Sequence, residues 1–168
     1  TDTNILNTEI TNTYFNLNIK QTDFVMLKEN ILVKKYNFKN NSNIDMDINF
    51  LIYSKVFSNL NNDTCGYIRN DALLQYNHDF TVCTFSKKQL YSYQINGIMD
   101  TFRTGIIGGK DYVGMSRDSG ISYKVDMLKP GEESELIIYV SINDNGEKNL
   151  LNELDTEINR IRKIDINQ

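Results

Sequence analysis

Carboxyl groups are the most frequent side chains in this sequence that could carry out acid–base chemistry. Inverting hydrolysis by paired carboxyl groups needs an acid and a base about 6.5–9.5 Å apart. The 22 acidic residues are instead dispersed along the chain. Asp45 and Asp47 alternate with apolar residues, Glu29 and Asp63 stand in polar turn-like segments, and Glu153 lies in the final amphipathic segment. These settings are typical of solvent-facing charge, so we predict no catalytic residue in this chain.

Histidine and cysteine chemistry is limited by number. His78 is the single histidine, and its neighbour Asp79 would point to the opposite face of a strand. Cys65 and Cys83 lack the spacing of a redox or zinc site, and we expect no metal and no cofactor. We expect both cysteines to be reduced thiols, because the composition does not resemble a disulfide-dense secreted scaffold.

Aromatic side chains are the remaining candidates for ligand contact, as stacking platforms for sugar rings. The chain has no tryptophan and ten tyrosines. Tyr91 and Tyr93 stand two residues apart in an extended segment and would share one strand face. They are the candidates for glycan contact, and burial in the core is the alternative for both.

The composition indicates one globular domain. The chain has 168 residues, of which 40% are hydrophobic, and a formal net charge of −4. Its 18 basic residues form no dense stripe, so we expect no nucleic-acid partner. No apolar run reaches membrane-spanning length, so we expect no membrane partner. The start at Thr1, with neither Met nor an apolar signal segment, predicts an excised part of a longer protein and slightly favours the cytoplasm, although a leader could have been lost.

Period-2 alternation of apolar and polar residues dominates the first three-quarters of the chain. The clearest example has Ile44, Met46, Ile48 and Phe50 on one strand face. Strands are predicted over residues 14–20, 23–27, 31–38, 44–54, 65–69, 72–76, 80–85, 90–95, 121–127 and 135–142. Because no helix separates them, we predict an all-β fold, a large antiparallel β-sandwich. The glycine-rich segment 96–110 has no clear period.

The hydrophobic period changes near the C-terminus, where apolar residues recur at helical spacing. The row consists of Leu150, Leu154, Ile158 and Ile161. The sequence predicts one C-terminal helix over residues 146–164, whose row could pack on the sandwich or face a further domain. The expected division is a β-sandwich domain, 1–142, and a C-terminal linker helix, 143–168, that leads toward a domain outside this sequence.

Four segments in this order resemble the N-terminal β-sandwich domain, called a super-sandwich, of bacterial and archaeal glucoamylase-like enzymes of glycoside hydrolase family 15. They are Asn30–Asn40, a strand followed by an asparagine turn; Asp47–Ser54; Asp71–Asp79; and Leu128–Leu136, which contains a Pro-Gly-Glu turn. The resemblance extends from Asn4 to Ile164 and ends in the helix that, in this family, connects to the catalytic domain.

The resemblance implies a galactose-mutarotase-like super-sandwich that is incomplete at its N-terminal end. It also implies a parent enzyme that hydrolyses α-glucosidic bonds with inversion, through two glutamates of an (α/α)6 barrel in the same polypeptide. No catalytic position of the family is matched here, so the implied role is non-catalytic support of that barrel. An oligosaccharide is a second partner to test, at Tyr91 and Tyr93.

Two other classes of protein share parts of this pattern. Aldose epimerases of the galactose-mutarotase type have a similar fold but use a histidine pair with a glutamate, which a single histidine cannot supply. A stand-alone carbohydrate-binding or adhesion-type β domain fits the asparagine-rich turns and the lack of catalytic groups. A downstream helical barrel would favour the hydrolase, and tandem β repeats would favour adhesion.

Overall fold

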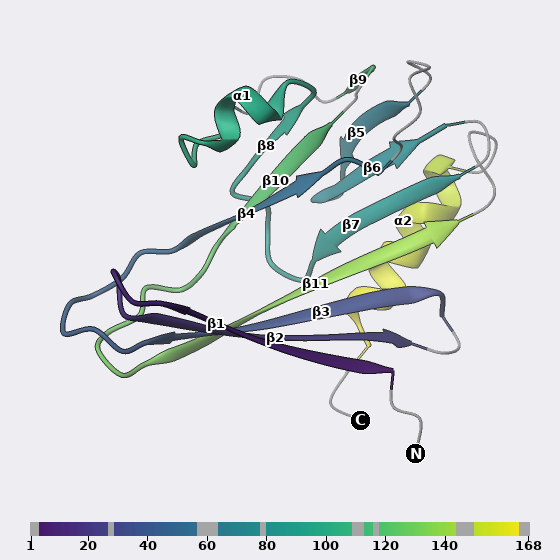
Figure 1. Ribbon diagram of the computed structural model, residues 1–168. Helices are drawn as coiled ribbons and strands as arrows, with labels where there is room; N and C mark the ends of the chain where they lie inside the picture. Colours follow the sequence, from purple (N-terminus) through teal and green to yellow (C-terminus); the bar gives the residue numbers. More distant parts are fainter. Residues whose placement is uncertain are drawn as a thin grey trace.

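The described residues form two antiparallel sheets of unequal size and one long helix (Figure 1). The computed structural model describes residues 4–26, 29–56, 64–77, 80–108, 113–115, 118–143 and 150–164, the last of these with side chains from residue 155 onward. The larger sheet has eight strands in the order β1 (Ile5–Asn12), β2 (Leu17–Met26), β3 (Ile31–Asn40), β11 (Glu133–Asn143), β7 (Thr81–Ser86), β6 (Ala72–Tyr76), β5 (Cys65–Arg69) and β9 (Val113–Met115). The smaller sheet has the order β4 (Asn49–Ser54), β10 (Ser119–Lys124) and β8 (Ser92–Ile95).

The centre of the eight-stranded sheet is buried on both faces, because alternate residues of its strands point to different layers. On β6, Ala72 and Leu74 pack in the layer that contains the C-terminal helix α2 (Leu150–Arg162), whereas Leu73 packs toward the three-stranded sheet. On β11, Tyr139 and Ile138 divide in the same way. The fold is therefore an all-β sandwich with a C-terminal helix on its outer face, as the sequence pattern predicted.

Asparagine residues in the left-handed backbone region form several of the turns. Asn70 and Asp71 have φ angles of 50° and 53° and connect β5 to β6 as a two-residue hairpin. Asn16 and Asn30, with φ angles of 52° and 49°, stand just before β2 and β3. Asparagine tolerates this region better than most residues, so its abundance in the sequence has a structural use.

The predicted strand 44–54 is shorter in the structure, because β4 begins only at Asn49. The fully buried Asn40 side chain donates hydrogen bonds to the carbonyl oxygens of Ile44, at 2.7 Å, and Leu128, at 2.9 Å. These bonds hold the backbone in a bend, and Met46 makes only an isolated bridge to Leu128. Ile44 is consequently 64% exposed, while Met46 and two later residues of the row, Ile48 and Phe50, still pack on the core.

Three elements had no sequence prediction, and one predicted pair of strands is a single strand. The strands β1 and β9 lie at the two edges of the larger sheet, where little apolar burial marks them. The helix α1 (Ile98–Phe102) forms within the segment of unclear period. The predicted strands 14–20 and 23–27 are together replaced by β2, which is preceded by a turn over 13–16.

The outer face of the three-stranded sheet is covered by α1. Ile98 is fully buried there, and its Cδ1 atom lies only 1.7 Å from where a Cβ atom would stand on Gly120. Ser92 and Asn49 donate side-chain hydrogen bonds to the carbonyl oxygens of Ile107 and Gly105. A glycine in β10 is therefore needed for α1 to approach the sheet.

Candidate functional site

The described part of α2 packs against its own sheet. Ile158 is 1% exposed and Ile161 is fully buried. Their layer also contains buried residues of four central strands: Ile31, Val33, Ala72, Leu74, Cys83, Phe85 and Tyr139. Figure 1 shows the helix lying behind this part of the sheet.

Polar contacts along α2 fix its position on the sheet. The Arg69 guanidinium forms a two-pronged ion pair with Asp155, in which Nη2 lies 2.6 Å from Oδ2 and Nε lies 3.1 Å from Oδ1. Arg162 donates to the carbonyl oxygen of Ser86 at 3.1 Å, and its guanidinium carbon lies 5.6 Å from the centre of the Phe85 ring. These contacts connect the helix to both β5 and β7.

Two residues of the predicted apolar row, Ile158 and Ile161, thus pack against the larger sheet of the same chain. The helix begins at Leu150 in the described residues, so the predicted start near residue 146 lies outside them. The side chains of Leu150 and Leu154 also lie outside the described residues. A role of α2 in contact with another domain remains a prediction.

The two tyrosines selected from the sequence lie in different environments. Tyr91 stands in the bend before β8 and is 59% exposed, with the Lys124 ammonium group 4.8 Å from its ring centre. Tyr93 packs on the core between the two sheets. The prediction that they share one face is wrong, because the strand begins only at Ser92.

Several of the described carboxyl groups are held by basic partners. Hydrogen bonds from Arg160 to Glu29 and from Lys39 to Glu133 lower the pKa values of these carboxyl groups, whereas a general acid needs the opposite shift. Within the described residues, no cluster of three metal-ligating side chains occurs. His78 lies outside those residues.

The cysteines are free thiols in the structure. Cys65 lies on β5 and Cys83 on β7, with β6 between the two strands. Adjacent strands are about 4.8 Å apart, so the Cα atoms of these residues are too far apart for a disulfide. None of the described helices is both long and apolar enough to cross a lipid bilayer.

A polar cluster that was not predicted lies on the face of β2 and β3 that points toward the smaller sheet. We call Gln21, Asp23 and Lys34 the β2–β3 cluster. The Lys34 ammonium nitrogen is 2.7 Å from Asp23 Oδ2, and Gln21 Nε2 donates to both carboxylate oxygens, at 2.9 and 2.8 Å. Knowledge of the hairpin register, which pairs Asp23 with Lys34 and Gln21 with Tyr36, would have revealed it.

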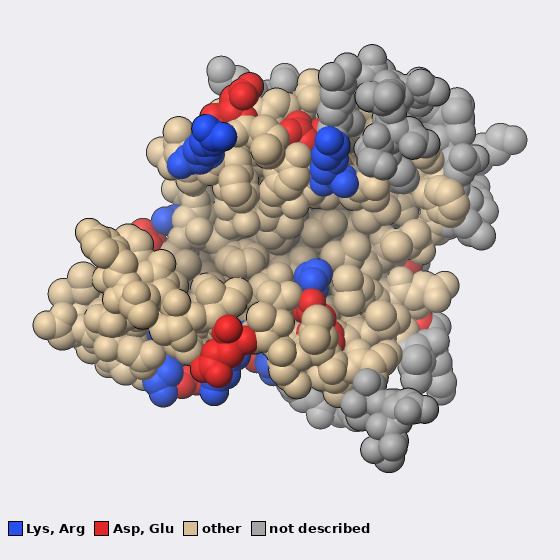
Figure 2. Space-filling model, viewed as in Figure 1, with Lys and Arg blue, Asp and Glu red and all other residues tan. Residues whose placement is uncertain are grey.

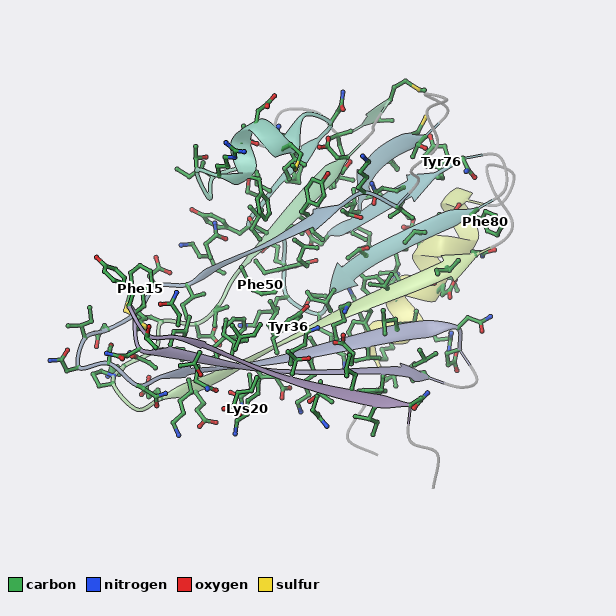
Figure 3. The ribbon with its side chains drawn as sticks, viewed as in Figure 1. Phe15, Lys20, Tyr36, Phe50, Tyr76 and Phe80 are labelled. Atoms are coloured by element: carbon green, nitrogen blue, oxygen red, sulfur yellow. The ribbon has the colours of Figure 1, made fainter. Side chains whose placement is uncertain are left out.

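Two aromatic rings adjoin the β2–β3 cluster. The ring centres of Tyr36 and Phe50 are 4.6 Å apart, with an interplanar angle of 50°. Burial, with a smaller contribution from the Asp23 charge, raises the pKa of Tyr36 to about 12. Figure 3 places Tyr36 and Phe50 in the space between β3 and β4, while Lys20 points to the other side of the larger sheet.

The space-filling view shows that this face of the molecule is hollowed. In Figure 2 a depression crosses the middle of the molecule, between the part that carries β1–β3 and the part that carries β4, β8 and β10. The β2–β3 cluster and its aromatic neighbours are only partly buried, as residues that line a depression should be.

A second surface feature is apolar and lies on and after α1. We call Met99, Phe102 and Ile106 the α1 patch. Their exposed fractions are 56%, 41% and 72%. Phe102 also contacts Tyr53 of β4 edge-to-face, with ring centres 5.7 Å apart.

Comparison with known proteins found similarity in structure but none in sequence. No protein-family model matches the chain, and no curated protein matches it. A bacterial glucoamylase, solved in complex with acarbose, shares the fold with a TM-score of 0.69 at 14% sequence identity. The match covers 96% of this chain and 24% of the glucoamylase chain.

GH36 α-galactosidases from Geobacillus stearothermophilus also match. One, solved in complex with raffinose, has a TM-score of 0.48 at 9% identity, over 84% of this chain and 24% of that chain. Another, in complex with stachyose, has a TM-score of 0.45 at 8% identity. The present chain thus spans about a quarter of the length of these glycoside hydrolases, and the glucoamylase match shows a shared β-sandwich fold.

Proposed function

We propose that this chain is the non-catalytic N-terminal β-sandwich domain of a glucoamylase-like glycoside hydrolase. The observation that carries the proposal is the glucoamylase match, which includes 96% of this chain but only 24% of the enzyme. A match of this kind is expected when a whole domain corresponds to one part of a larger enzyme.

The role proposed for this domain is to support an (α/α)6 catalytic barrel in the same polypeptide. That barrel would hydrolyse α-glucosidic bonds with inversion. The carboxyl groups of the described residues are dispersed, and several are ion-paired, which favours a supporting role over a catalytic one because inversion requires two cooperating carboxyl groups.

The α1 patch is the surface that we assign to the barrel. Ile158 and Ile161 are already buried against the sheet, so they cannot also contact another domain. The α1 patch gathers three large apolar side chains within eight residues, and it does not lie on an edge strand. Grouped exposed apolar side chains are typical of interaction surfaces.

The test compares thermal unfolding of this chain alone with that of a longer chain that includes the following helical region. If the two domains share an interface, the β domain should melt with the barrel or later, and above its temperature in isolation. Ile106→Ser in the α1 patch should reduce this rise in the melting temperature of the β domain. Leu6→Ser on β1 is the matched control, since Leu6 is 62% exposed and lies far from α1 in the fold.

Two outcomes would contradict the supporting role. The first is two independent transitions with the melting temperature of the β domain unchanged. The second is full activity of the barrel after deletion of the β domain. If Ile106→Ser and Leu6→Ser both abolish the rise in melting temperature, the supporting role would stand, but the α1 patch would be rejected as the surface that contacts the barrel.

A further inference from the structure

We propose that the hollow between β2–β3 and β4 is a binding site for a neutral saccharide. Gln21, Asp23 and Lys34 would bind sugar hydroxyl groups, and Tyr36 with Phe50 would contact the apolar face of a ring. The site does not depend on the proposed function, because a saccharide can bind here whether or not a catalytic barrel is attached.

The chemistry of the β2–β3 cluster fits neighbouring hydroxyl groups. A hydroxyl group both donates and accepts hydrogen bonds. The Asp23 carboxylate only accepts, the Lys34 ammonium group only donates, and the Gln21 amide does both, so together they serve every hydroxyl orientation. The Asp23 carboxylate already accepts hydrogen bonds from Lys34, at 2.7 Å, and from Gln21, at 2.8 and 2.9 Å, so a ligand would meet an ordered set of polar atoms.

The charge of the cluster favours a neutral ligand. Lys34 and Asp23 are in direct contact, and their formal charges cancel. An anion bound at Lys34 would face the Asp23 carboxylate, and a cation bound at Asp23 would face the ammonium group. A neutral polyhydroxyl compound is repelled by neither the Asp23 carboxylate nor the Lys34 ammonium group.

The position of the ion pair is unusual for a purely structural contact. Among the ion pairs of the described residues, Asp23 is the most buried carboxylate, with 15% of its side chain exposed, and Lys34 is 29% exposed. Lys34 stands opposite Ile138 and on the same sheet face as the fully buried Phe38. A partly buried ion pair contributes little stability compared with apolar residues of similar size, so a binding role explains its presence better.

The neighbouring rings supply the second element of a sugar site. Tyr36 and Phe50 come from different sheets and are each partly buried, so both are held by packing on the core. Small-molecule sites are typically concave, with apolar walls and a few fixed polar groups. Tyr36 and Phe50, which Figure 3 places between β3 and β4, would form such an apolar wall beside the β2–β3 cluster.

The test is a titration of the chain with maltotriose, raffinose and cellotriose, followed by NMR chemical shifts of the backbone amides. Binding of at least one of these sugars should shift resonances of β2, β3 and β4. Asp23→Asn and Lys34→Met should each weaken binding by about tenfold, the effect of losing one hydrogen bond to a charged group.

Controls separate loss of binding from loss of fold. Lys39→Met and Glu133→Gln remove the members of an ion pair, 3.0 Å apart, on the opposite face of the same sheet, and they should leave binding unchanged. Tyr91→Ala, at the position selected from the sequence, should also have no effect. Replacing both members of the pair, Asp23→Leu together with Lys34→Met, should keep the melting temperature equal or raise it, because no unpaired charge is then left in the partly buried site, whereas an ion pair needed for the fold would give a loss.

Three results would overturn the site. They are no shift with any of the three sugars, equal binding by Asp23→Asn and wild-type protein, and competition of inorganic phosphate with the sugar. Each can occur while the longer chain still unfolds as one unit, so failure of this site and failure of the supporting role are distinguishable.

Discussion

Truncation of one α2 side chain tests whether the helix belongs to this domain. Ile161 is fully buried between α2 and the larger sheet. Ile161→Ala removes the equivalent of three methylene groups, each contributing about 0.8 kcal/mol when buried, or about 2.4 kcal/mol together. The cavity adds to this, so we expect a total loss of about 3–4 kcal/mol in the free energy of unfolding.

Urea unfolding followed by circular dichroism measures this loss. Ile161→Val, which removes one methyl group, should cost about 1 kcal/mol and provides a graded comparison if the alanine variant does not fold. Lys163→Ala is the control at an exposed position just after the helix and should change stability by less than about 0.5 kcal/mol. Equal small effects of Ile161→Ala and Lys163→Ala would refute packing of α2 on its own sheet. The apolar row of α2 would then be a candidate for contact with another domain.

Three further predictions concern the sheet packing, the response to acid and the thiols. Gly120→Ala should destabilise the protein by about 1–3 kcal/mol in urea unfolding, because the added methyl group would displace α1. Arg160→Met should lower stability at neutral pH but not in strong acid, because the hydrogen bond from Arg160 lowers the pKa of Glu29 below 4.5 in the folded protein. The stability that this contact contributes is therefore complete above pH 4.5 and is lost as the pH falls through the pKa of Glu29 in the folded protein. Alkylation without reductant should add two groups to the unfolded chain, and in the folded protein Cys65 should react first, since burial raises the pKa of the Cys83 thiol well above its usual range.

Matched measurements can contradict each of these expectations. Gly114→Ala, where an added Cβ would meet only Ile95 Cγ2 at 3.8 Å, is the control for Gly120→Ala, and an equal loss would disprove the close approach of α1. An unchanged pH profile in Arg160→Met would show that the Glu29 contact has no energetic effect in solution. An intact mass with no alkyl groups would indicate a disulfide.

The sequence predicted the fold class because apolar and polar residues alternate along much of the chain and no helical period separates the predicted strands. The strands β5 and β6 were predicted with the observed bounds, since their hairpin turn is local and their residues pack on both layers. The edge strand β1 was missed because all eight of its residues are exposed, so no burial pattern is required of it. The late start of β4, at Asn49 and not at the predicted residue 44, was missed because the Asn40 side chain that bends the preceding segment bonds to a residue 88 positions away.

The candidate sites were harder to predict, since they depend on register and tertiary contact. Tyr91 and Tyr93 were paired by spacing, but the start of β8 at Ser92 separates them. The β2–β3 cluster joins Asp23 to Lys34 across a hairpin whose register the sequence left open. Phe50 reaches the same region from the other sheet, which no periodicity could indicate.

The central place of β11 has a consequence for the timing of folding. The strands β1–β3 form one antiparallel group, and β5–β7 form another with β9. Among the described strands, β11 alone connects them, by pairing with β3 on one side and β7 on the other. During synthesis, both groups must therefore wait for residues 133–143 before the larger sheet can close, and α2 can dock only after that. Such late, non-local pairing slows folding to the millisecond-to-second range of all-β domains and exposes the edges of β3 and β7 to chaperones in the meantime.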